Sequence, residues 1–89
     1  MANLPAIIRA TRASANALSA MSRHARAAAD ASATIALNHR MVAAGHISAD
    51  TAAMGNRIAI ARKGNAMRQW QMASRRFDRA QITLANNPI

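Results

Sequence analysis

Arginine is the residue type in this chain with the clearest chemistry. The 89 residues include eleven Arg and one Lys but three Asp and no Glu, so the formal net charge is +9. A guanidinium group binds phosphate or carboxylate through two parallel hydrogen bonds. We therefore expect an anionic partner, either an acidic protein surface or nucleic acid. The candidate anion-binding residues are Arg9, Arg12, Arg23, Arg26, Arg68, Arg75, Arg76 and Arg79.

The remaining chemically active side chains do not form a recognisable catalytic or metal-binding pattern. His24 and His39 are widely spaced and His46 falls in an expected turn, so the three do not converge as metal ligands must. Ser48 and Asp50, next to His46, are better explained as a helix cap. The sequence also lacks Cys, a Gly-rich phosphate loop and a nucleophile elbow. We predict a protein that is not an enzyme and that uses no cofactor, metal or small-molecule substrate.

The elements that carry these side chains are predicted to be two long helices. Twenty-five residues are Ala, the strongest helix former, and residues that favour strands are scarce. Asn3 and Ser48 are expected N-caps, Pro5 fits a first turn, and Gly45 suits a helix end. The predicted fold is all-α: a single domain forming an antiparallel hairpin, with a helix over about 4–44, a turn at 45–48 and a helix over about 49–85. A break near Gly64, giving three helices, is the alternative.

Apolar periodicity predicts which helix faces pack. In the first helix, Leu4, Leu18 and Ala25 fall on one heptad line, and a second line holds Ile7, Met21, Ala28, Ile35 and Val42; these two lines are expected to form the seam. The Arg residues of this helix fall away from it. In the second helix an Ala recurs every seven residues with larger apolar residues beside it, and this surface is expected to face the core. The predicted self-association residues of the second helix are Ala52, Ala59, Ala66, Ala73, Ala80, Ile60, Met67, Trp70, Phe77 and Leu84.

The other side of the second helix also mixes apolar residues with Arg, as at Met54, Ile58, Met72 and Ile82. A lone hairpin covers one face of each helix, and a helix of about 36 to 40 residues is a rod of about 55 to 60 Å. We therefore expect a homo-oligomer, or docking with other assembly proteins, in a helical filament, a secretion-type tube or a virion. The alternatives are a stand-alone basic protein that binds nucleic acid and an amphipathic protein on a membrane surface.

A short Cys-free chain that forms two helices around a polar turn resembles, in architecture, the needle subunits of type III secretion systems. It also resembles the small hairpins named for a Trp-x-Gly motif in their turn. The turn here, Gly45-His46-Ile47-Ser48, lacks the Pro-bounded motif of the needle subunits. Trp70 lies in the second helix and is followed by Gln71-Met72. The residues thus place the chain in neither family.

The expected location stays open between the cytoplasm, a secreted filament and a virion. The Arg- and Ser-rich residues 1–29 resemble an organelle-targeting segment, but the same helical pattern continues beyond them. A Sec-type signal is not expected because no continuous apolar stretch is present. No stretch approaches the roughly 20 apolar residues of a transmembrane helix.

Overall fold

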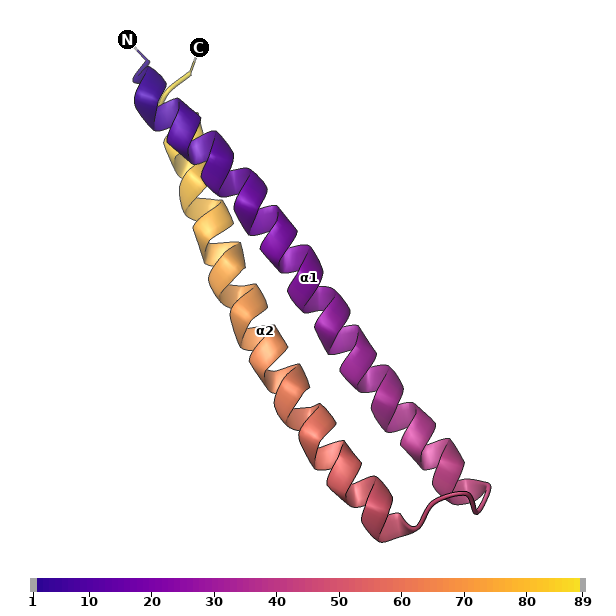
Figure 1. The fold of residues 1–89 in the computed structure, drawn as a ribbon. Helices are drawn as coiled ribbons and strands as arrows, with labels where there is room; N and C mark the ends of the chain where they lie inside the picture. Colours follow the sequence, from indigo (N-terminus) through magenta and orange to yellow (C-terminus); the bar gives the residue numbers. More distant parts are fainter. Residues whose placement is uncertain (1, 89) are drawn as a thin grey trace.

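The computed structural model describes residues 2–88, which form two long antiparallel helices joined by one turn (Figure 1). Helix α1 spans Leu4–Ala43 and helix α2 spans Ala49–Ala85. The hairpin is a thin rod with extents of 67 × 15 × 14 Å. The start of α1 and the end of α2 lie together at one end of this rod. The prediction of an all-α hairpin is confirmed.

The helix boundaries follow from local capping. The side chain of Asn3 accepts a hydrogen bond from the backbone N–H of Ala6, and that of Ser48 accepts one from Thr51. Each replaces a partner that the first turn of a helix lacks. Gly45 adopts a positive φ of 75°, which ends α1 one residue before the predicted Ala44. The bounds of α2 agree with the sequence-based prediction.

Helix α2 runs without a break through both of its glycines, so the three-helix alternative is wrong. A glycine inside a helix costs about 1 kcal/mol relative to Ala. Thirty-seven residues of continuous backbone hydrogen bonding and a packed face absorb that local cost.

The core is a seam of small side chains between the two helices. Ala52, Ala59, Ala66, Ala73 and Ala80, which share one line of α2, are buried, and Ala73 is 0% exposed. On α1 the buried residues include Ile7, Ala10, Ala17 and Ala31. Alanine on both helices allows the backbones to approach closely, so the alanines of α2 are confirmed as core residues.

One predicted seam line of α1 is wrong. Ile7 is buried and Met21, Ala28, Ile35 and Val42 are half-buried, as expected for the line that they share. Leu4, Leu18 and Ala25 are instead exposed. The second line of the seam is the one that holds Ala10, Ala17, His24, Ala31 and Asn38. Small residues there match the alanines of α2, whereas two leucines would hold the helix backbones apart.

Polar pairs fix the alignment of the two helices along the seam. Gln81 Nε2 donates to the buried Ser14 Oγ at 2.8 Å, near the chain ends. Near the turn, Asn38 Nδ2 donates to Asn56 Oδ1 at 2.9 Å. No buried side-chain nitrogen or oxygen within residues 2–88 lacks a hydrogen-bond partner. Sliding one helix along the other would break both pairs and bury unpaired polar groups.

Candidate interaction surfaces

The hairpin has two broad sides, and helical geometry decides which residues reach each one. A residue four positions after a seam alanine lies about 40° to one side of it, and a residue three positions after lies about 60° to the other. Trp70 and Phe77 are four residues after Ala66 and Ala73, respectively. Arg76 is three residues after Ala73. The aromatic residues and this Arg therefore point toward opposite sides of the hairpin.

The first of these, which we name the apolar side, presents large hydrophobic groups to solvent. Ile60 is 60% exposed, Met67 51% and Trp70 38%, and from α1 the residues Leu4, Ile8 and Leu18 join them. A shallow groove on this side is lined by Ala25, Ala28, Met67, Trp70 and Gln71, so bulk on α2 faces small residues on α1. Within residues 2–88, Arg57 and the half-buried Lys63 are the cations whose helical positions fall toward this side.

The predicted self-association residues thus separate into two groups. The five alanines are occupied within one chain, since each is buried against α1. Phe77 and Leu84 are half-buried. Ile60 and Met67 do not face the core as expected but solvent, because their helical position is about 100° from the alanine line. The sequence predicts that the leucines of α1 on this same surface lie in the seam, because their heptad spacing alone does not distinguish one side of a seam from the other.

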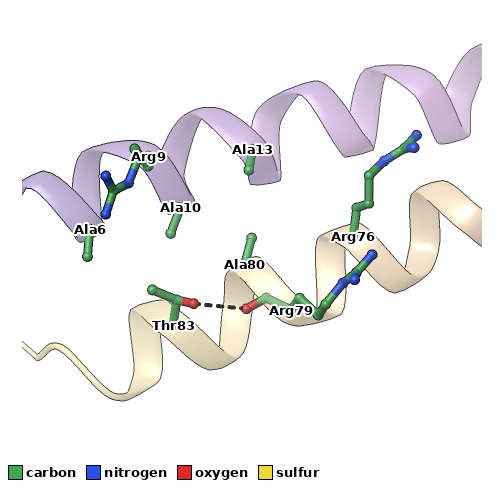
Figure 2. A pocket seen from close by; sticks show the side chains of 8 residues that line it. All are labelled: Ala6, Arg9, Ala10, Ala13, Arg76, Arg79, Ala80 and Thr83. Carbon is green, nitrogen blue, oxygen red and sulfur yellow. Dashed lines mark hydrogen bonds between the residues drawn. The ribbon is translucent and has the colours of Figure 1, made fainter.

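The second side, which we name the cationic side, gathers arginines from the two ends of the chain. Arg9 on α1 and Arg76 and Arg79 on α2 line a groove of about 380 Å³, which we name the arginine groove. Figure 2 shows Arg9 directed toward one end of this groove and Arg76 and Arg79 toward the other. Four alanines form its surface between the helices, together with Thr83. The alanines are Ala6, Ala10, Ala13 and Ala80. Sixty-seven residues separate Arg9 from Arg76 in sequence, so only the hairpin brings them to one site.

The charged side chains that line the arginine groove are all positive. Within the described part of the chain, no Asp lines it. Asp78 is two residues from Arg76 and therefore lies about 160° around the helix, away from the groove. The Thr83 hydroxyl donates to the backbone oxygen of Arg79 at 3.2 Å, as the dashed line in Figure 2 marks. The unpaired donors that the groove offers an anion are therefore guanidinium N–H groups.

Other predicted anion-binding residues lie elsewhere. Arg12 and Arg26 are exposed on the back of α1, opposite the seam, and Arg68 and Arg75 are exposed on the back of α2. Arg23 is exposed on α1 and points toward the cationic side. The structure thus brings together Arg9, Arg76 and Arg79 and leaves the remaining candidates outside the arginine groove.

A second groove on the cationic side contains an arginine that was not predicted as a candidate. Arg62 lines it together with Asp30, His24 and Ile58. The signal that identifies Arg62 is its position three residues after the buried Ala59, the same offset that places Arg76 beside Ala73. This groove has a carboxylate and an apolar side chain in its wall, so it is a weaker anion site than the arginine groove.

The other chemically active residues do not assemble into a centre. Within residues 2–88, no group of three or more His, Cys, Asp or Glu side chains is placed to hold a metal ion. His24 is half-buried in the seam, and His39 and His46 are exposed. Neither described helix has both the length and the apolar character needed to cross a membrane. Comparison of the chain with models of protein families, with curated proteins and with solved structures finds no match.

Proposed function

We propose that this chain is a non-enzymatic structural subunit that pairs with a second copy of itself through the apolar side, as a building block of a larger helical assembly. That assembly would be a filament, a secretion-type tube or a virion. The outward Arg residues would then meet acidic protein or nucleic acid. The observation that carries this proposal is the exposure of Leu18, Ile60, Met67 and Trp70 on one nearly cation-free side of the hairpin.

The size of this side is sufficient for a stable dimer. A rod face of 67 Å by 15 Å has a footprint of about 1,000 Å². A typical stable interface buries roughly 800 Å² of each partner. Large side chains on α2 beside Ala25 and Ala28 on α1 leave room for the bulk of a second copy, as close packing requires.

Charge favours the apolar side as the contact over the rest of the surface. Each copy carries +9, so copies repel unless their cations stay apart. With the apolar sides in contact, the two cationic sides are separated by two layers of about 14 Å each. That separation exceeds the Debye length of about 8 Å at physiological salt, so the repulsion is largely screened. Any pairing through the cationic sides would instead bring Arg76 and Arg79 of the two copies together.

The test is the oligomeric state of the full chain at about 0.15 M salt, measured by sedimentation velocity with light scattering. We expect a dimer or a larger species. The double variant Ile60→Gln/Met67→Gln should raise the dissociation constant of self-association by about 10- to 100-fold. The matched control is Met54→Gln/Ile82→Gln, since Met54 is 66% and Ile82 60% exposed on the back of α2. A monomeric wild-type chain, or an equal effect of the two double variants, would contradict the proposal.

The second candidate function is nucleic-acid binding by a single hairpin without self-association. The arginine groove favours it, because three arginines line it without a carboxylate. A monomer that binds DNA or RNA with a steep dependence on salt would support this function over the structural one.

A further inference from the structure

We propose that the arginine groove binds the phosphodiester backbone of a nucleic acid. The ligand contacts would come from Arg9 on α1 and from Arg76 and Arg79 on α2. This inference does not depend on self-association, because the arginine groove and the apolar side lie on opposite sides of the hairpin. The arginine groove is lined by residues of both helices, so neither helix forms this site alone.

The shape of the arginine groove suits a phosphate chain. Its surface between the helices is made of alanine methyl groups and Thr83, so the side chains between an incoming phosphate and the flanking arginines are small (Figure 2). Arg76 and Arg79 are three residues apart on one helix and are therefore neighbours on its surface. Arg9, on the other helix, points toward the opposite end of the groove (Figure 2). Successive phosphates of a chain that lies along the groove can thus receive guanidinium hydrogen bonds from Arg9 at one end and from Arg76 and Arg79 at the other.

Within the described part of the chain, no lining carboxylate neutralises the positive charge of the arginine groove. Three guanidinium groups surround it without a lining carboxylate, so each raises the electrostatic free energy of the others. A bound anion removes that repulsion and releases the counter-ions that screen it. The methyl groups offer no donor or acceptor to read a base, so we expect binding without sequence preference.

The cations continue along the rod, which favours a linear polyanion over a single phosphate ion. Arg62 lies on the same side fourteen residues from Arg76, or about 21 Å along α2. Arg23 points toward this side from α1 at an intermediate level. A duplex carries one charge per about 1.7 Å of its axis, so a strand lying along the cationic side meets phosphates at each arginine. A flat bilayer surface would reach the outermost side chains but not the alanine surface between the helices.

The test compares two triple variants with the same net charge. Arg9→Gln/Arg76→Gln/Arg79→Gln empties the arginine groove, and Arg12→Gln/Arg26→Gln/Arg40→Gln removes three exposed arginines from the back of α1. Gln has a helix propensity close to that of Arg, and circular dichroism verifies the fold of each variant. Binding to a 20-base-pair duplex and to a 20-nucleotide oligo-dT strand is measured by fluorescence anisotropy between 50 and 200 mM NaCl.

We expect the groove variant to lose at least about 10-fold in affinity at 100 mM NaCl, and the slope of log K against log salt to fall by about 2 to 3. The back variant should change the slope by less than about 1. Equal losses in the two variants would show that net charge alone drives binding and would overturn the site. So would the absence of oligonucleotide binding, or groove-dependent binding only to vesicles that contain phosphatidylserine.

The same variants separate this inference from the proposed self-association. The groove variant should sediment as the wild-type chain does, and Ile60→Gln/Met67→Gln should keep the wild-type salt slope. A groove variant that falls apart into monomers would contradict the independence of the two surfaces.

Discussion

The two sides of this hairpin share one seam but differ sharply in chemistry. The apolar side exposes Ile60, Met67 and Trp70. The cationic side, on the other side of the same seam, carries Arg76 and Arg79. The difference arises from position relative to a buried alanine: Ile60, Met67 and Trp70 lie one or four residues after one, whereas Arg76 lies three residues after one and Arg79 one residue before one. A thin two-helix rod can therefore present two unrelated surfaces, because a seam of small residues leaves many of the larger residues beside it exposed.

The small size of the seam residues explains why neither the apolar nor the charged side chains beside the seam are covered within one chain. Ten of the eleven residues that make up the buried seam are apolar, and nine of these ten are alanines, so the seam itself buries little side-chain bulk. The larger apolar side chains are left beside it, where another molecule can cover them. Arg9, Arg23, Arg62, Arg76 and Arg79 are left on the other side, where anions can neutralise them.

The largest expected effect comes from placing a cation on the apolar side. Met67→Arg should raise the dissociation constant of self-association by at least about 100-fold, since an unpaired charge in the contact costs about 3 kcal/mol or more. Met54→Arg adds the same charge to the back of α2 and should leave the constant within about threefold. Sedimentation velocity distinguishes the two; equal effects would mean that the apolar side is not the contact.

A smaller effect is expected from forcing the two helices apart. Ala73→Leu adds three carbons at a position that is 0% exposed, and overpacking there should lower the free energy of unfolding by about 1 to 3 kcal/mol. Ala61→Leu makes the same change at an exposed position of α2 and should alter stability by less than about 0.5 kcal/mol. Urea unfolding followed by circular dichroism measures both. A free energy of unfolding of Ala73→Leu equal to that of the wild-type chain would mean that the two helices are not closely packed at Ala73.

The smallest expected effect distinguishes the glycines of α2. A Cβ at Gly64 would have Arg68 Nη1 at 3.6 Å, an ordinary contact, so Gly64→Ala should stabilise the chain by about 1 kcal/mol. A Cβ at Gly55 would lie 3.1 Å from Asn38 Nδ2, which already donates to Asn56. Gly55→Ala should therefore gain less. Thermal unfolding tests the order, and a larger gain at Gly55 would contradict it.

Capping and composition were enough to predict the helices of this protein. Asn3, Ser48 and Gly45 set the ends of α1 and the start of α2, because each satisfies or relaxes backbone groups within its own turn. The seven-residue recurrence from Ala52 to Ala80 likewise identified the buried line of α2. These are local properties, so a single sequence determines them.

The tertiary structure decided which residues flank the seam and which distant residues meet. Leu18 and Ala17 are neighbours in sequence, yet close approach of the backbones selects the alanine for the seam and leaves the leucine exposed. Arg9 lines the same groove as Arg76 and Arg79 only because the chain folds back on itself near Gly45. The apolar pattern of each helix follows from its own sequence. The packing of the two helices decides which residues of one helix lie beside which residues of the other.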